Sequence, residues 1–192
     1  MSNNKLRSFV GMPVPEPMLQ QLSSIAAGMA ALDSARMSWV SEENYHLTLL
    51  FLGEQSPTWL DEFAQALFDE LSLDEQYLSV SRIMPFPENS PRLVAAMIEE
   101  TDSLKQLHHD VKKIAKGLGF KPEKRRFTPH ITLARKYPKQ VGQIIPTVFD
   151  KVDAYAHELI IYESQLRQDG AQYFPLYGFE AQRMDAGMLN EG

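Results

Sequence analysis

The 192-residue chain contains no cysteine. A disulfide framework, a thiolate metal site and a thiol nucleophile are therefore excluded. Long apolar runs are also absent, because the longest, LTLLFLG at residues 47–53, falls far short of the ~20 residues that a membrane span needs. The first 18 residues, MSNNKLRSFVGMPVPEPM, lack the apolar segment of a signal peptide. We therefore expect a cytoplasmic protein without membrane association.

Positive charge is scarce as well. The chain has 19 Lys and Arg against 25 Asp and Glu, which gives a net charge of −6. This balance argues against a general nucleic-acid coat, because nonspecific phosphate binding needs overall positive charge. A local basic site remains open, since residues 112–126 carry seven Lys and Arg against the single acidic Glu123. That segment either steers an anionic ligand or is simply a solvated helix face and loop.

The order of apolar and polar residues predicts an α+β fold. A hydrophobic content of 44% and a charged content of 23% are ordinary for a globular protein. Helices are expected at 17–32, 58–71 and 102–117, and strands at 6–14, 45–53, 77–86, 92–100, 130–135, 156–166 and 171–182. Residues 138–146 are expected to be loop, and Asp169-Gly170 the turn of the closing hairpin.

We interpret 1–192 as one bilobal domain with intertwined lobes, approximate halves 1–88 and 89–185, and a tail at 186–192. The expected architecture is a pseudo-twofold duplication. Two mostly antiparallel sheets would flank a central cleft, with the helices on the outside.

One phrase occurs twice in the chain. His46-x-Thr48-Leu is repeated at His130-x-Thr132-Leu, each on the strand that follows the first helix of its half. With five His and six Thr, chance predicts only about 0.16 His-x-Thr pairs. The repeat and its matching placement indicate an old internal duplication.

Strand geometry predicts where these side chains point. Alternate residues share a face, so His46 lies with Thr48 and His130 with Thr132, while regular alternation puts Phe51 and Arg135 on the other face. An unpartnered buried polar group costs roughly 1–3 kcal/mol. Four such groups on central strands therefore indicate a solvent-filled cleft that both halves share.

Two imidazoles and two hydroxyls in one cleft suit displacement at phosphorus. Histidine titrates near pH 6.5, so one neutral ring can take a proton while the other, charged, gives one. The threonine hydroxyls can bond the non-bridging oxygens, where charge accumulates. This chemistry requires no metal, and no HExxH pattern, carboxylate triad or glycine-rich phosphate loop occurs in the chain. We expect no cofactor.

The sequence resembles the 2H phosphoesterase superfamily, in particular the bacterial RNA 2′,3′-cyclic phosphodiesterases once called 2′-5′ RNA ligases. The stretches that carry the resemblance are NYHLTLLFLG, FTPHITLAR, RSFVGMPVP, MSWV, SPRLVAAM and YESQLRQDGAQYFPL. The resemblance implies a bilobal fold and hydrolysis of a 2′,3′-cyclic phosphate at an RNA 3′ end to a 2′-phosphate. It also implies that an RNA 5′-hydroxyl can replace water, which gives a 2′-5′ linkage.

Carried over by motif, the resemblance implies distinct roles for the two histidines. His46 would donate a proton to the leaving 3′ oxygen and His130 would accept one from water, with Thr48 and Thr132 beside them. The expected partner is an RNA with a 2′,3′-cyclic phosphate end or a small cyclic nucleotide. Nothing in the sequence indicates an obligate protein partner.

Five further residues are candidate substrate contacts. Arg126 and Arg135 flank the second motif strand, and Tyr45, Phe127 and Tyr137 can stack on a base. Tyr45 stands where the family usually has Leu, which bears on nucleotide preference. Two alternatives stay open: a 2H enzyme for another cyclic nucleotide or a 2′-5′ oligonucleotide, and a non-catalytic module that binds RNA ends.

Overall fold

A single mostly antiparallel sheet organises the molecule. The structure is a computed structural model that describes residues 5–33, 36–138, 145, 149–167 and 170–181. Its strands are β1 (Leu6–Pro13), β2 (Ser38–Trp39), β3 (His46–Gln55), β4 (Gln76–Phe86), β5 (Leu93–Ile98), β6 (His130–Arg135), β7 (Asp153–Ala156), β8 (Glu158–Arg167) and β9 (Gly170–Glu180). Its helices are α1 (Glu16–Leu32), α2 (Pro57–Glu70) and α3 (Asp102–Gly117), with a 3₁₀ turn, η1, at Glu42–Asn44.

The strands follow the order β7-β4-β5-β6-β3-β1-β8-β9, and β2 pairs with β6. The two motif strands, β3 and β6, are therefore neighbours at the middle of the path. Their ladder contains one Cα pair, Leu47 with Ile131, and both side chains are fully buried. This single pair joins β3, β1, β8 and β9 on one side to β6, β5, β4 and β7 on the other, where β2 also pairs with β6. The α+β, mostly antiparallel class is confirmed, but the two expected sheets are one continuous sheet, because β3 and β6 pair directly. The pseudo-twofold duplication stays a prediction.

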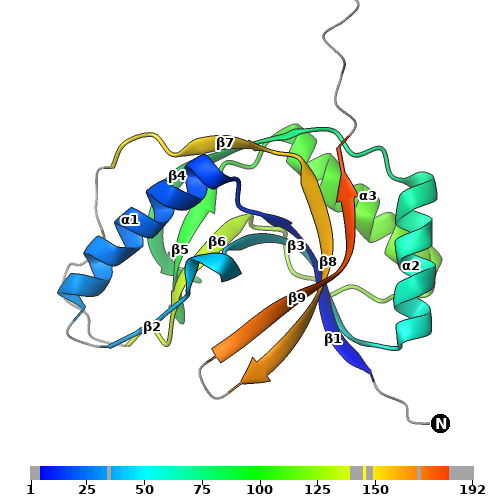
Figure 1. Cartoon of the computed structure of the whole chain (residues 1–192), viewed down its shortest axis with the longest axis horizontal. Helices are drawn as coiled ribbons and strands as arrows, with labels where there is room; N and C mark the ends of the chain where they lie inside the picture. The colour runs from blue at the N-terminus through cyan, green and yellow to red at the C-terminus, as the bar shows by residue number, and fades with distance from the viewer. Residues whose placement is uncertain (1–4, 34–35, 139–144, 146–148, 168–169, 182–192) are drawn as a thin grey trace, which may run out of the picture.

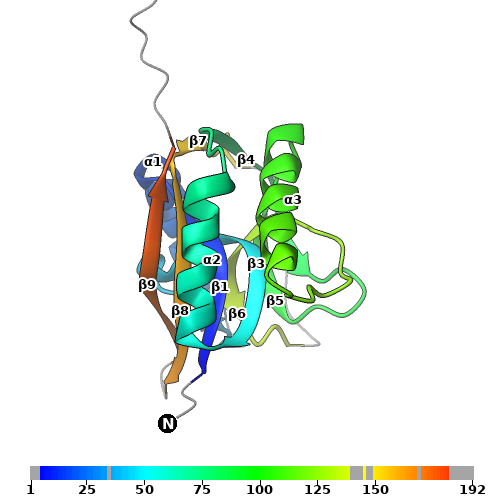
Figure 2. The same ribbon diagram turned by 90° about the vertical axis from the view of Figure 1, so that its right-hand side faces the viewer.

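The helices lie on the outside of the curved sheet. Helices α2 and α3 lie side by side on one flank, and α1 lies on the opposite flank of the molecule (Figures 1 and 2). Helix α3 turns a stripe of apolar residues inward, where it packs near β3; the stripe is Leu104, Leu107, Val111, Ile114 and Ala115. No helix in the described ranges has the length and apolarity to cross a membrane.

Side chains set the starts of α2 and α3. Ser56 accepts a hydrogen bond from the backbone N–H of Trp59, and Thr101 accepts one from that of Leu104, at 3.2 and 3.1 Å. These N-caps satisfy amide groups that a helix leaves unpaired at its first turn. The helix boundaries expected from the sequence therefore agree with the structure to within a residue or two.

Two parts of the sequence-based description change. Strand β3 does not stop at Gly53 but continues to Gln55, with Gly53 at φ +67°, a conformation that glycine adopts without strain. Strand β7 was not expected, and it pairs with β4 at the edge of the sheet. The predicted turn residue Asp169, the tail 186–192 and most of the loop 138–146 lie outside the described residues.

We predict that the junction of the two motif strands limits the stability of the fold. Leu47→Ala or Ile131→Ala should each lower the free energy of unfolding by about 2–5 kcal/mol, because each removes a fully buried side chain and leaves a cavity. Denaturant unfolding measures the loss. As a control, Leu32→Ala should change stability by under about 0.5 kcal/mol, since Leu32 is 67% exposed. Losses of that small size at Leu47 and Ile131 would contradict the prediction.

Candidate active site

The junction of β3 and β6 brings the two motifs onto one face of the sheet. Because Leu47 opposes Ile131 in an antiparallel pair, continuing the register sets His46 toward Thr132 and Thr48 toward His130. Leu47 and Ile131 point into the core, so the four motif side chains point to the other face. All four are partly buried. We call this the histidine face.

Both motif strands contain a β-bulge at the same place. In the β1–β3 ladder, Gly11 pairs with Thr48 and Val10 with Leu50, so Leu49 is the extra residue. In the β5–β6 ladder, Ala95 pairs with Thr132 and Val94 with Ala134, so Leu133 is extra. A bulge shifts the alternation of side chains by one residue beyond it.

The bulges correct two expectations from the sequence. Arg135 pairs with Leu93, which lies two residues from Ala95 on a regular strand and so shares the face of Thr132. Phe51 pairs with Phe9 in the same way. Regular alternation had assigned both side chains to the opposite face, and that assignment is wrong because of the extra residue in each strand. Arg135 and Phe51 are exposed on the histidine face.

The two imidazoles are held in the same manner. Nδ1 of His46 lies 2.8 Å from the carbonyl oxygen of Asn44, and Nδ1 of His130 lies 2.7 Å from that of Thr128. A carbonyl only accepts, so each neutral ring carries its proton on Nδ1, and its Nε2 has a free lone pair. Within the described part of the chain, no protein group bonds either Nε2 or the hydroxyls of Thr48 and Thr132. These atoms are available to a ligand.

Burial and neighbouring charge keep both rings neutral. Removal from water lowers the pKa of His46 to about 4, and the charges of Arg135 and His130 add to this effect, while the Asn44 carbonyl opposes it. Burial likewise lowers the pKa of His130, with a further contribution from Arg135 and opposition from the Thr128 carbonyl. Arg135 therefore lies close enough to act on both histidines. Bringing an anion to this face would favour the protonated rings.

Aromatic rings build a wall beside His46. Its ring lies 4.7 Å from that of Phe9 and 4.8 Å from that of Tyr173, the latter edge-on. Tyr162 stacks on Phe9 at 5.0 Å. Phe86 lies beside His130, also at 4.7 Å. Sequence reasoning missed these contacts because the rings come from β1, β4, β8 and β9, whose pairing a local pattern does not reveal.

Two arginines on the histidine face differ in their surroundings. Arg135 donates a hydrogen bond from Nη2 to the hydroxyl of Tyr173 at 3.1 Å. Arg82 pairs with Met97, which in turn pairs with His130, so Arg82 reaches the same face two strands away. The sequence did not single out Arg82, because its place depends on the register of β4.

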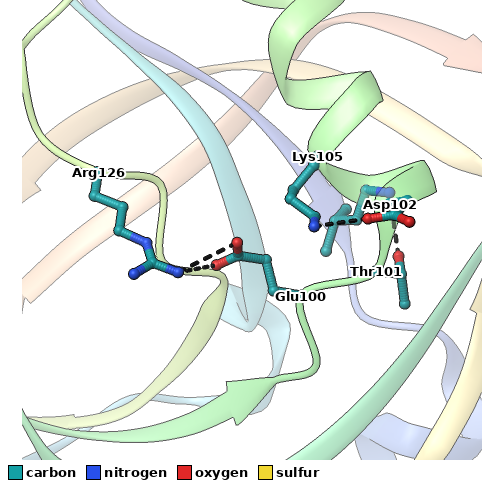
Figure 3. A network of polar contacts seen from close by, with 6 residues as sticks. Glu100, Thr101, Asp102, Lys105 and Arg126 are labelled. Atoms are coloured by element: carbon teal, nitrogen blue, oxygen red, sulfur yellow. Dashed lines mark hydrogen bonds and ion pairs between the residues drawn. The ribbon is translucent and has the colours of Figure 1, made fainter.

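Arg126, Phe127 and Tyr137 have other partners. Arg126 bonds Glu100 at 3.3 Å, within the polar network of Figure 3. Phe127 stacks on His108 of α3 at 4.2 Å with nearly parallel rings. Tyr137 is partly buried against the core. In the described part of the chain, no hydrogen bond or ring contact of these three side chains reaches His46 or His130.

The Tyr45 side chain and the basic segment have surroundings of their own. Tyr45 is 5% exposed in the core, where burial raises its pKa to about 12, so its ring presents no face to a base. The helical part of the basic segment lines a hollow of about 250 Å³ with His108 and His109; its lysines are Lys112, Lys113 and Lys116. A second hollow, of about 470 Å³, lies between α2 and β9.

No group of three His, Cys, Asp or Glu side chains is placed to hold a metal ion among the residues that the structure describes. Metal independence stays a prediction. The geometry thus defines a class of site: a pair of imidazoles, two hydroxyls and a guanidinium on one face of an antiparallel sheet, suited to acid–base chemistry on an anion.

The chain belongs to the 2′-5′ RNA ligase superfamily, whose family model matches residues 19–165. An RNA 2′,3′-cyclic phosphodiesterase of Thermotoga maritima is 31% identical over 177 residues, which cover 90% of this chain and 94% of that protein. A protein of the same name from Geobacillus stearothermophilus is 27% identical over 94% of this chain, which spans only 60% of that relative's length. The structure of E. coli LigT complexed with 3′-AMP has the same fold, with a TM-score of 0.80, 22% identity, and coverage of 94% and 100% of the two chains.

We predict that His46 makes the fold sensitive to acid. A buried ring with a folded-state pKa of about 4 binds fewer protons than the unfolded chain, where histidine titrates near 6.5. Its contribution to stability is therefore complete above pH 6.5 and is lost as the pH falls toward 4, by at most about 3 kcal/mol. Denaturant unfolding across this range measures the slope.

Substitution isolates that contribution from the acid response of carboxylates. His46→Gln should flatten the loss of stability between pH 6.5 and 4, because the variant has no ring to protonate. The matched control is His109→Gln at an exposed position of α3, which should follow the wild-type curve. Parallel curves for the wild type and His46→Gln would refute the prediction.

Proposed function

We propose that the protein is an RNA 2′,3′-cyclic phosphodiesterase that hydrolyses cyclic phosphate ends to 2′-phosphates by two-histidine acid–base catalysis without a metal. The observation that carries the proposal is the matched presentation of two Nε2 atoms on one face, each fixed by a backbone carbonyl at Nδ1. The names of its relatives support the substrate class. The substrate is an RNA end or a small cyclic nucleotide.

The proposed reaction displaces one ribose oxygen from phosphorus. Nε2 of His130 takes a proton from water as the water oxygen bonds to phosphorus. The bond from phosphorus to the 3′ oxygen breaks, and Nε2 of His46 gives that oxygen its proton. Exchange with solvent then restores both rings. If the 5′-hydroxyl of a second RNA replaces water, the same steps form a 2′-5′ linkage, and ligation is the proposed side reaction.

Charge on the non-bridging oxygens needs compensation during this step. The hydroxyls of Thr48 and Thr132 are free to donate hydrogen bonds there, and Arg135 supplies a positive charge on the same face. Because the site is partly buried, these interactions are stronger than they would be in water. Arg82 adds a more distant cation that suits the chain of an RNA rather than its reacting end.

Protonation of His46, which the proposed mechanism needs, depends on the bound anion. Burial lowers the pKa of His46 to about 4 and also lowers that of His130, so both rings are neutral in the free protein near pH 7. The proposed donor role of His46 needs a protonated ring. A phosphodiester anion at hydrogen-bond distance from His46 raises its pKa by roughly one to three pH units. Substrate binding thus prepares the acid.

Removing either ring should stop turnover. His46→Ala and His130→Ala should each lower kcat for a nucleoside 2′,3′-cyclic phosphate by roughly 10²–10⁴-fold, because each removes one proton-transfer group. Product analysis of the wild-type reaction should yield the 2′-phosphate isomer. Circular dichroism and thermal unfolding establish that the variants fold. His157→Ala, at a half-exposed ring paired with Glu75, serves as the matched control and should retain activity.

The same assay separates the alternatives. Turnover that persists in either histidine variant would refute the two-histidine mechanism, and inhibition by a chelator that zinc reverses would refute metal independence. Stoichiometric binding without conversion would identify a non-catalytic module. A panel of cyclic nucleotides and 2′-5′ oligonucleotides identifies a 2H enzyme with another substrate. The cytoplasmic location stays a prediction alongside this proposal.

The dependence of rate on pH should be bell-shaped and acidic for the free protein. Productive encounters need one protonated and one neutral ring, and this state is most populated between the two pKa values, which lie at about 4 for His46 and below the ordinary value for His130. The maximum of kcat/KM should therefore fall below pH 6.5. The maximum of kcat should lie at higher pH, because the bound anion raises both pKa values. Coincident maxima would contradict this account.

A further inference from the structure

Tyr173 connects the two motif strands from a distant part of the sheet. It lies on β9, which is four strands away from β6 in the order β6-β3-β1-β8-β9. In a flat sheet four spacings amount to about 19 Å. Its hydroxyl nevertheless lies 3.1 Å from Nη2 of Arg135, because the sheet is curled and not flat (Figure 1).

The ring of Tyr173 contacts the other motif. It meets the imidazole of His46 edge-on at 4.8 Å and the ring of Phe9 edge-on at 5.1 Å. Edge-to-face contacts of this kind fix the orientation of both partners. One side chain from the closing hairpin thus contacts the guanidinium of the second motif strand and the imidazole of the first.

An arginine on an exposed strand position needs such an anchor. Arg135 is exposed, and ordering a long side chain costs up to about 2 kcal/mol of rotamer entropy. The tyrosine hydroxyl accepts one of the five guanidinium N–H bonds and leaves the others for an anion. A guanidinium that is already ordered loses less entropy when it binds phosphate.

We propose that Tyr173 is a positioning residue: its hydroxyl holds Arg135 over the histidine face, and its ring, which packs at 77° to the imidazole, holds His46 beside it. The inference rests on the proposed function and deepens it, because it assigns the closing hairpin a part in phosphate binding. Tyr173 acts through Arg135 and His46 and takes no proton in the reaction.

A double-mutant cycle tests the proposal. Tyr173→Phe keeps the ring and removes only the hydroxyl, so it should lower kcat/KM for a nucleoside 2′,3′-cyclic phosphate about tenfold. In an Arg135→Ala background the same change should have no further effect, because the group that the hydroxyl holds is gone. Tyr155→Phe, at a 54% exposed ring on β7, is the matched control and should resemble the wild type.

Two kinetic outcomes would overturn the proposal. If Tyr173→Phe equals the wild type, the hydroxyl only fills space. If Tyr173→Phe costs the same factor with and without Arg135, the hydroxyl contacts the substrate directly. Circular dichroism and thermal unfolding establish that each variant keeps the fold.

A readout without turnover keeps the proposal separate from the proposed function. The charge of Arg135 lowers the pKa of His46, so NMR titration of that ring reports where the guanidinium lies. Tyr173→Phe should move the His46 pKa upward, toward its value in Arg135→Ala. An unchanged His46 pKa would refute positioning even in an active enzyme. A wild type without turnover would refute the proposed function, and the titration would still decide the role of Tyr173.

Discussion

The antiparallel pair of Leu47 with Ile131 fixes the relation between the two halves of the sheet. Both side chains are fully buried, and no other Cα pair of the described β3–β6 ladder joins the strands. Hydrophobic burial at this point therefore decides which polar side chains meet on the opposite face. Every feature of the site depends on it, since a slip of one residue would send the histidines into the core and the leucine and isoleucine to solvent.

The sequence predicted the part of this arrangement that is local and repeated. Recurrence of His-x-Thr-Leu indicated two equivalent strands, and alternation placed His46 with Thr48 and His130 with Thr132. The prediction from regular alternation is wrong beyond Leu49 and Leu133, the third residue after each histidine. A bulge at these positions was not predicted, because neither residue is a glycine or proline that would indicate one. The sequence did not predict the contacts of Tyr173 and Phe86 with the histidines for another reason. These contacts arise from sheet curvature and strand order, which depend on the whole chain and not on a local pattern.

Electrostatics links binding to chemistry in this site. Burial and the charge of Arg135 disfavour protonated imidazoles in the free protein. The electrostatic potential of this face therefore favours an anion over a cation. In the proposed mechanism, a bound phosphodiester would counter this effect and favour protonation of the rings. The acid would then form only in the complex, which would couple substrate binding to catalysis without a conformational change.

The two motifs are built alike, but the surroundings of His46 and His130 differ. Each motif has a carbonyl at Nδ1, a bulge after its threonine, and a phenylalanine ring at 4.7 Å. Five residues beyond the histidine, however, one strand carries Phe51 and the other Arg135. His46 also faces two tyrosine rings, Tyr162 and Tyr173. In the proposed reaction, an aromatic wall suits the nucleoside that retains the leaving oxygen, whereas an attacking water needs none. The surroundings of the two rings thus support the proposal that His46 is the acid and His130 the base, although their own backbone contacts are alike.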